Sequence, residues 1–489
     1  MSRRFRWILA GIVTAAAAIR LYRLDHFSYG LDEILQAYWL HGSWDFFWRS
    51  LRFDGFHPPL DYVIDRFLEM LHPADAIRKI PSLLWGAGTV AAFGALLARR
   101  AGETAGWVAA GLLAMAPFHV RFSQELRPYS LSLFTLCLAL YALVRFLERP
   151  GAVRLAAVFL ASLATAYALY TAAFVLAIAA AALLLEDASG PPGDRRRSAR
   201  RFLLWSPAFV FALWLAYLPW WPVFREAARR PPMAARAAIS LQRADRILSF
   251  FTFSPDDGYR LHAGGWFFVA LVGVGAWLAI SRRGLRFLAA WGLGGFAAIE
   301  ILGQLHPHFD FSRRFVPAGP GWIALAAIGL AELLRRPVTR LAGAAALASV
   351  LVLDVRGLQI YFREGRADWR ALADYLRRES RPAEKIFTEN QYAQLCVAFY
   401  LAGPDWLHEA LDGGHPARDL PNLEGEVVRL NWSWAPGSRA WLVLAGEPRH
   451  EGLRRWAEQF PAFPFPRSEH AILHRLDPNL RAAALGAAR

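Results

Sequence analysis

The sequence predicts a polytopic, all-α membrane protein that ends in a small α/β soluble domain. Its 489 residues are 56% apolar and only 19% charged, whereas soluble domains carry roughly 25% charged residues. Apolar blocks long enough to cross a bilayer as helices recur up to about residue 359, and charged residues become frequent from about residue 360. We therefore expect a membrane domain over residues 1–359 and an α/β domain over residues 360–489.

The membrane domain contains about eleven apolar blocks. They run near 5–23, 80–98, 103–120, 129–147, 153–170, 171–185, 202–221, 264–281, 287–304, 315–334 and 341–359. The fifth and sixth form one stretch, which we divide at Tyr167, Tyr170 and Thr171 because aromatic and polar groups favour the membrane interface. The first block follows basic residues as a signal peptide would, but no clean cleavage site ends it, so a retained helix is expected.

Arginines between the blocks predict the orientation, because short basic loops stay on the cytoplasmic side. A cytoplasmic amino terminus puts five basic hinges inside, near residues 99–100, 145–154, 195–201, 282–286 and 335–340. An odd number of spans then puts the C-terminal domain outside. One segment that this orientation puts outside, 222–263, departs from the rule, because it contains six arginines: Arg225, Arg229, Arg230, Arg236, Arg243 and Arg246. It is either an amphipathic helix on anionic lipid heads or a cradle for a lipid phosphate.

The remaining charges and the cysteines exclude several classes of protein. Basic residues exceed acidic ones, 55 against 40, which gives a net charge of +15. The arginines sit between apolar blocks and form no continuous basic tract, so nucleic acid is not an expected partner. Cys137 lies in an apolar block and Cys396 in a polar one, so neither a disulfide nor a zinc site is expected.

The C-terminal part alternates helices and strands. The sequence predicts helices over 368–378 and 453–460 and strands over 385–388, 440–445 and 471–476. Trp432, Trp434 and Trp441 are either core residues or a surface on which a sugar stacks, and the core interpretation is favoured. This pattern is typical of a small α/β domain.

Polar side chains gather on the outer face, first in the loop over residues 24–79. Asp32 and Glu33 follow the first span, where one carboxylate could take a proton from an acceptor hydroxyl and the other could hold a metal ion or a hydroxyl. Capping of a helix by acidic residues explains them equally well. His57, held rigid before Pro58 and Pro59, could ligate a metal ion or donate to a phosphate.

Three further clusters lie on the same face. Asp61, Asp65 and Glu69 recur every four residues, so we expect them on the solvated side of an amphipathic helix. The run over 121–129 contains Gln124, Glu125, Arg127 and Tyr129, which form either a functional site or a structural Glu125–Arg127 pair. The run over 306–317 contains His306, His308, Arg313 and Arg314, which could hold a phosphate.

Together these motifs resemble a known superfamily. The Asp32-Glu33 pair, the His-Pro-Pro-Leu run at 57–60, the Ser-Gln-Glu-Leu-Arg-Pro-Tyr run at 123–129 and Arg314-Phe315 before a late span resemble the protein mannosyltransferase and aminoarabinose transferase superfamily. More narrowly, the chain looks like bacterial integral-membrane glycosyltransferases of family 39, which have the GT-C fold. The resemblance covers most of the chain.

The resemblance implies a function and a place in the cell. Such enzymes work in the bacterial cytoplasmic (inner) membrane and transfer a sugar, with inversion, from a polyprenyl-phosphate-linked donor to a glycan, lipid or protein acceptor on its outer face. Carried over, it makes Asp32 the catalytic carboxylate and Glu33 its neighbour in acceptor binding. Seven residues are substrate-binding candidates: His57, Gln124, Glu125, Arg127, Tyr129, Arg313 and Arg314.

One departure concerns metal binding. Aminoarabinose transferases carry an acid and a lysine before the double proline, where this chain has Phe56 and His57. The metal and phosphate contacts of that branch therefore do not carry over intact. A divalent metal ion remains an open cofactor, with His57 and Glu125 as its candidate ligands.

Two other classes of function are weighed against the enzyme. A transporter or flippase for lipid-linked sugars would also need many helices and outer arginines, but it predicts polar residues near the bilayer midplane. The candidates for that role, Glu300 and Gln304, are close to one end of their span. A catalytically inactive assembly protein with the same fold would be recognised if Asp32→Asn left function intact.

Overall fold

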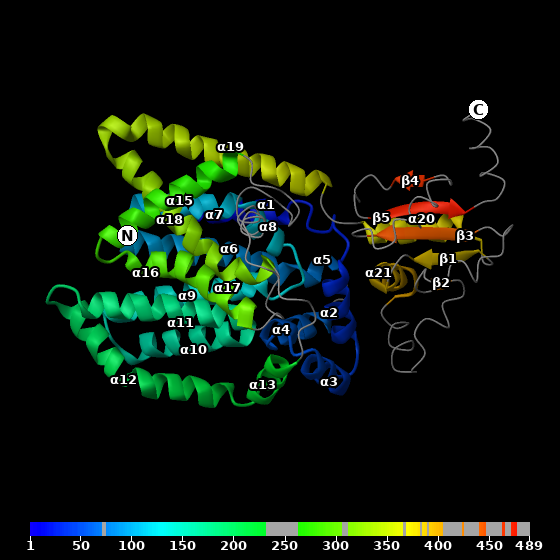
Figure 1. Cartoon of the computed structure of the whole chain (residues 1–489), viewed down its shortest axis with the longest axis horizontal. Helices are drawn as coiled ribbons and strands as arrows, with labels where there is room; N and C mark the ends of the chain where they lie inside the picture. Colours follow the sequence, from blue (N-terminus) through cyan, green and yellow to red (C-terminus); the bar gives the residue numbers. More distant parts are fainter. Residues whose placement is uncertain are drawn as a thin grey trace. The chain divides into compact units, whose positions relative to one another are not determined.

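The computed structural model is mostly helical (Figure 1). It describes residues 1–70, 75–230, 263–305, 312–364, 368–381, 384–388, 391–403, 423–424, 440–445, 462–464 and 471–476. The chain divides into two compact units. Unit 1 comprises Met1–Tyr22, Leu51–Phe67 and Arg78–Tyr361, and unit 2 comprises Arg23–Ser50, Leu68–Ile77 and Phe362–Arg489.

Unit 1 is a helical bundle whose elements coincide with the predicted apolar blocks. Its long helices are α1 (Arg3–Leu21), α6 (Ile80–Arg100), α7 (Glu103–Met115), α9 (Tyr129–Glu148), α10 (Ala152–Ala168), α11 (Tyr170–Ala188), α12 (Asp194–Tyr217), α15 (Ala263–Ser281), α17 (Gly295–Leu305), α18 (Gly319–Arg335) and α19 (Arg340–Glu364). Short elements join them: α8 (Pro117–Phe122), α13 (Trp221–Arg229), α16 (Arg286–Ala289), the π-helix η1 (Ala290–Gly294) and the 3₁₀ helices η3 (Ser312–Ala318) and η4 (Pro337–Thr339). Unit 1 is thus the polytopic all-α part that the sequence predicts.

Eight helices in the described part of the chain are long and apolar enough to span a membrane. Three of the predicted spans do not reach that standard: α7 and α10 have 13 and 17 residues, and every 18-residue stretch of α1 carries at least three arginines. The chain is a multi-pass membrane protein, and the number of about eleven spans stays a prediction.

The division of the long apolar stretch is confirmed. Helix α10 ends at Ala168, Leu169 is extended at φ −157°, and α11 begins at Tyr170. The hydroxyl of Tyr167 donates a hydrogen bond to the carbonyl of Ala216 at 2.9 Å. The polar aromatic residues thus lie at the turn between the two helices.

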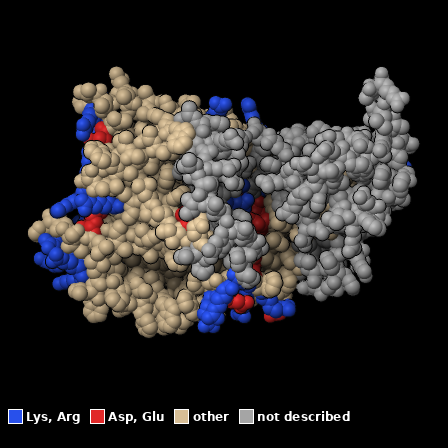
Figure 2. Space-filling model, in the orientation of Figure 1, with Lys and Arg blue, Asp and Glu red and all other residues tan. Residues whose placement is uncertain are grey.

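The basic hinges of unit 1 meet at one end of the bundle, the end at which the amino terminus lies (Figure 1). Arg100 at the end of α6 binds both carboxylate oxygens of Asp187 at the end of α11, at 3.0 and 2.9 Å. Glu186 accepts a hydrogen bond from the amide of Gly284 in the next hinge. Arg99 donates to Glu148 of α9 at 2.6 Å. Space-filling atoms show the same mixture of arginines and carboxylates on this end (Figure 2).

Unit 2 contains the small α/β part. Its outer-loop helices are α2 (Leu31–His41) and the first turns of α3 (Trp44–Asp54), and α5 (Asp75–Arg78) lies at its edge. The C-terminal elements are α20 (Trp369–Glu379), β1 (Lys385–Thr388), α21 (Gln391–Ala402), β2 (Leu423–Glu424), β3 (Ala440–Ala445), β4 (Ala462–Pro464) and β5 (Ala471–Leu476). Their sheet has the order β2-β1-β3-β5-β4, parallel from β2 to β3 and antiparallel beyond.

The strands predicted at 385–388, 440–445 and 471–476 are confirmed, and so is the helix at 368–378, which Asp368 caps through the amide of Ala371. The helix predicted at 453–460, together with Trp432 and Trp434, lies outside the described residues. The core interpretation of Trp441 is confirmed. Its side chain is fully buried, and its indole N–H donates to Glu384 Oε2 at 3.0 Å.

Hydrogen bonds explain why pieces of the outer loop fold with the C-terminal elements. The hydroxyl of Tyr400 accepts from the amide of Tyr29 at 2.7 Å and donates to Asp75 at 3.2 Å. Arg370 binds Asp75 at 2.8 Å and Asp25 at 3.2 Å. The domain limits 1–359 and 360–489 stay a prediction, while the compact units divide the loop over 24–79 between them.

One prediction about this loop is wrong. Asp61, Asp65 and Glu69 were expected to be solvated, but helix α4 (Leu60–Glu69) leaves only 2%, 3% and 9% of them exposed. The four-residue spacing does put them on one face, but this face packs inward. Glu69 there lies 3.2 Å from Nδ1 of His41.

Candidate functional site

The Pro58-Pro59 run presents His57 to Arg127 within unit 1. Arg127 lies in the short connection between α8 and α9, and one terminal guanidinium nitrogen is 3.4 Å from Nε2 and 3.5 Å from Nδ1 of His57. The other terminal nitrogen is 3.5 Å from the hydroxyl of Tyr62. These are long, weak contacts, and they place the guanidinium beside two neutral groups.

Positive charge dominates the surroundings of His57. Burial lowers the pKa of His57 well below 6.5, and the charges of Arg127, Arg314 and Arg313 lower it further. The imidazole is therefore neutral at physiological pH. A neutral ring near three guanidinium groups is an arrangement that can bind an anion.

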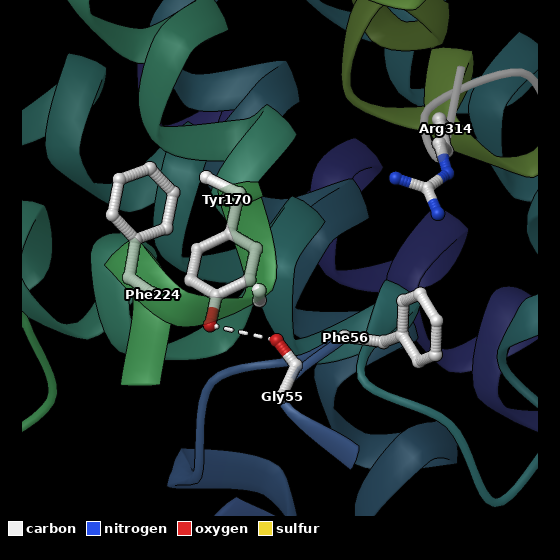
Figure 3. Close-up of a pocket in the computed structure, with 7 residues that line it drawn as sticks. Gly55, Phe56, Tyr170, Phe224 and Arg314 are labelled. Carbon is white, nitrogen blue, oxygen red and sulfur yellow. Dashed lines mark hydrogen bonds between the residues drawn. The ribbon is translucent and has the colours of Figure 1, made fainter. Parts of the chain in front are cut away.

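A small pocket opens beside these residues (Figure 3). Phe56, Tyr170 and Phe224 supply aromatic walls, and Arg314 of η3 supplies a guanidinium. Gly55 completes the floor in a left-handed conformation, φ +63°, which favours glycine. Its carbonyl accepts a hydrogen bond from the hydroxyl of Tyr170 at 3.1 Å. The pocket thus combines an apolar wall with one positive charge.

The other predicted residues of the 121–129 run have structural contacts. Glu125 is buried and accepts from Nε of Arg121 at 3.0 Å. The amide of Gln124 donates to the carbonyls of Arg20 and Tyr22, at 2.8 and 2.9 Å, and accepts from the hydroxyl of Tyr361 at 3.0 Å.

Tyr129 is almost fully buried beside these groups. Its ring packs 4.6 Å from that of Phe122 and 6.2 Å, edge-on, from that of His57. Arg127 and Tyr129 therefore meet His57, whereas the side-chain amide of Gln124 ties α1 to α19.

Sequence reasoning missed a buried polar cluster around Arg20. Its guanidinium donates to Ser123 Oγ at 3.1 Å and to the carbonyls of Ala16 and Ala114, at 2.9 and 3.1 Å, and lies 2.6 Å from Nδ1 of His119. The signal was present, because an arginine ending an apolar block must find partners or reach water. This cluster ties the end of α1 to α7 and α8.

The outer arginine segment is partly described. Arg225 and Arg229 are exposed on α13, an amphipathic helix that contains Trp221 and Phe224. Arg230 instead binds the main chain, donating to the carbonyls of Asp54, at 2.6 Å, and Phe53. Arg236, Arg243, Arg246, His306 and His308 lie outside the described residues. Of the arginines in this segment, Arg230 thus has a structural role.

Asp32 and Glu33 belong to unit 2, in the first turn of α2. Glu33 is 3% exposed, and its Oε2 accepts a hydrogen bond from the amide of Gly30 at 3.0 Å, so it caps its own helix. Asp32 is partly exposed. Burial raises the pKa of the Cys396 thiol on α21, and the charges of both carboxylates raise it further. For Glu33 the capping interpretation is realised by the bond to Gly30, while Asp32 is half-buried.

A metal site is a separate question. Within the described residues, no group of three or more His, Cys, Asp or Glu side chains could hold a metal ion. His57 and Glu125 face arginines at hydrogen-bond distance, which disfavours a cation at either. The metal ion stays a prediction.

The fold places the chain in a class: a multi-pass membrane protein with a fold like that of the GT-C glycosyltransferases of family 39. Residues 57–221 match the family model of dolichyl-phosphate-mannose-protein mannosyltransferases. No curated protein sequence has significant similarity to the chain.

Two solved structures show the fold over nearly the whole chain. ArnT from Cupriavidus metallidurans bound to undecaprenyl phosphate is 13% identical, with a TM-score of 0.55, over 95% of this chain and 97% of that one. The apo form of the same protein is 12% identical, with a TM-score of 0.54, over 98% and 99% of the two chains. The family match and the fold together support a membrane glycosyltransferase.

Proposed function

We propose that this protein transfers a sugar from a polyprenyl-phosphate-linked donor to an acceptor hydroxyl on the outer face of the bacterial cytoplasmic membrane. The observation that carries the proposal is the pocket of unit 1, where Arg314 adjoins aromatic walls close to Arg127 and His57. An isoprenoid phosphate has the same two parts, an apolar chain and an anion. The relative bound to undecaprenyl phosphate supports this choice of donor.

The chemistry needs a base and positive charge. The acceptor oxygen attacks the anomeric carbon, the bond from that carbon to the phosphate oxygen breaks with inversion, and the phosphate leaves with the bonding electrons. Arg127, Arg314 and Arg313 would stabilise the leaving phosphate. Asp32 would take the proton of the acceptor hydroxyl, and Glu33 would support acceptor binding through the helix turn that it caps.

A neutral His57 fits a donor role. Because its pKa lies well below 6.5, the ring carries one N–H at neutral pH and can donate it to a phosphate oxygen without adding a charge. Tyr62 and Tyr129 pack beside this ring.

The test supplies membranes containing the protein with radiolabelled polyprenyl-phosphate sugars and follows the label. The wild type should release label from the lipid to an acceptor, and Asp32→Asn should lower the rate by about 10²- to 10⁴-fold, as expected for a lost general base. Asp45→Asn is the matched control, because Asp45 is a highly exposed carboxylate of the same loop, paired with Arg49. It should leave the rate unchanged.

Two outcomes would overturn the proposal. Label that crosses the bilayer still attached to its lipid, without release, would identify a flippase. Equal transfer by Asp32→Asn and the wild type would remove Asp32 from the mechanism.

Arg127→Gln and Arg314→Gln should raise KM for the donor, because each removes one charge facing the phosphate.

A further inference from the structure

The arginines of η3 depend on a turn whose main chain is held from outside. Arg313 and Arg314 begin this 3₁₀ helix, and Phe315 and Val316, both buried, anchor it. In a 3₁₀ turn the carbonyl of Pro317 would accept from the N–H three residues on, but that residue is Pro320, which has none. The 3₁₀ pattern therefore provides no main-chain donor for this carbonyl.

Trp291 supplies a side-chain donor instead. Its indole N–H donates to the carbonyl of Pro317 at 2.9 Å, and its side chain is fully buried. The ring packs edge-on against Phe93 with 5.9 Å between centroids. This bond joins η3 to the helix segment that precedes α17.

The segment that carries Trp291 is itself unusual. Residues Ala290–Gly294 form a π-helical turn, η1, inside the span that begins with α16. Such turns insert a residue into a helix and often occur at functional sites. Gly292 and Gly321 let η1 and α18 approach closely, since a Cβ on Gly321 would lie 2.5 Å from the nitrogen of Gly292. The close approach brings the indole of Trp291 within reach of η3.

A second indole makes a similar bond in the same helix pair. Trp322 of α18 donates to the carbonyl of Gly292 at 3.0 Å. Its acceptor thus belongs to the π turn η1, whereas the acceptor of Trp291 belongs to η3. The two tryptophans therefore form a matched pair: both donate an indole N–H to a main-chain carbonyl, and only the Trp291 bond is to the helix that contains Arg313 and Arg314.

We propose that Trp291 is a positioning residue of the donor-phosphate site, which sets Arg314 at the pocket by fixing the carbonyl of Pro317. The inference rests on the proposed function, because it assumes that Arg314 faces the donor phosphate. Figure 3 shows the guanidinium of Arg314 directed toward the pocket that Phe56 lines. Trp291 is not one of the residues that line the pocket, and its indole N–H acts through the η3 main chain.

The experiment compares Trp291→Phe with Trp322→Phe in the purified full-length protein. Phenylalanine keeps an aromatic ring in each site and removes the N–H together with part of the indole, and this loss of buried side-chain volume is common to both variants. Binding of farnesyl phosphate, a short polyprenyl phosphate, and KM and kcat for the polyprenyl-phosphate sugar donor are measured for both. Trp291→Phe should weaken binding and raise KM about 5- to 10-fold, the effect of one hydrogen bond, with kcat at saturation unchanged. Trp322→Phe should leave KM within about 2-fold of the wild type.

A double-mutant cycle separates positioning from a general structural effect. In an Arg314→Gln background, Trp291→Phe should have no further effect on KM, because the residue through which it acts is gone. Hydrogen exchange of the amides at 313–316 should be faster in Trp291→Phe than in Trp322→Phe.

The outcomes are distinguishable. If the wild type itself does not bind farnesyl phosphate, the proposed function fails. If the wild type binds it and the two tryptophan variants behave alike, or Trp291→Phe acts equally with and without Arg314, the positioning role is wrong. Poor folding of Trp291→Phe shows as a lower kcat and a lower fraction of active protein, whereas the positioning role changes KM.

Discussion

At the scale of single residues, the end of unit 1 opposite the basic hinges contains arginines with different tasks. Arg20 is buried and fully bonded, Arg121 pairs with Glu125, and Arg230 binds main-chain carbonyls. Arg127 lies 3.4 Å from Nε2 of His57 and 3.5 Å from the hydroxyl of Tyr62, and Arg314 lines the pocket. These two arginines, beside His57 and at the pocket, are the candidates to bind an anion.

The ring of His57 makes stability depend on pH. Its pKa is lower in the folded chain than in the unfolded one, so the unfolded chain binds the proton more readily. Stability from this group is complete above about pH 6.5 and is lost as the pH falls below it. At about pH 5.5 the loss cannot exceed about 1.4 kcal/mol.

We therefore expect His57→Gln to show a shallower fall in the thermal unfolding midpoint than the wild type between about pH 7.5 and about pH 5.5. Tryptophan fluorescence of the detergent-solubilised protein measures it. Parallel curves for the two proteins would show that His57 is not buried among the arginines as described.

At the scale of elements, α13 forms one wall of the pocket. Arg230, directly after α13, binds this helix to the loop at residues 53–54. The guanidinium bonds the carbonyls of Phe53 and Asp54 and stacks 5.9 Å from the ring of Phe53. Trp220, just before α13, donates to the hydroxyl of Tyr170 at 2.9 Å, which in turn donates to Gly55. Loop, α11 and α13 are thus joined by polar contacts around an apolar pocket.

Breaking the Arg230 contacts should loosen this wall. Arg230→Gln should speed hydrogen exchange of the amides at 53–56 and lower the free energy of unfolding by about 1 to 3 kcal/mol, the range for hydrogen bonds to a charged group. Arg229→Gln is the matched control, since Arg229 is exposed on the same helix, and it should change neither. Equal exchange rates in both variants would mean that α13 is held by its apolar face alone.

At the scale of the whole molecule, the basic hinges gather at one end of unit 1, where arginines exceed the acids that pair with them. Glu148 meets Arg99, Arg145 and Arg195, and Glu332 meets Arg282 and Arg336. Such an excess of arginine is expected on the cytoplasmic side.

This orientation can be tested with single cysteines. Both native cysteines are buried, so a membrane-impermeant maleimide should not label the wild type in intact cells. Arg225→Cys should be labelled in intact cells, and Arg197→Cys, whose side chain is 72% exposed, should be labelled only after permeabilisation. The reverse pattern would put the amino terminus outside.

The sequence by itself determined most of the long helices of unit 1 and three strands of the small sheet. Helices and strands followed from apolar periodicity and length, which are local properties: the turn at Leu169 and three strands of the small sheet were found in this way. The motifs at 57–60 and 123–129 also identified Arg127, His57 and Tyr129, which the structure brings together.

Only the tertiary structure decided which polar residues are bonded to the chain itself. Spacing could not show that the acidic face of α4 packs inward, that Gln124 bonds α1 and α19, or that Glu33 caps its helix. It could not show that an indole 26 residues away serves the carbonyl of Pro317. Burial and hydrogen bonding depend on segments far apart in the sequence, and a buried polar group is stable only with a partner that the fold supplies.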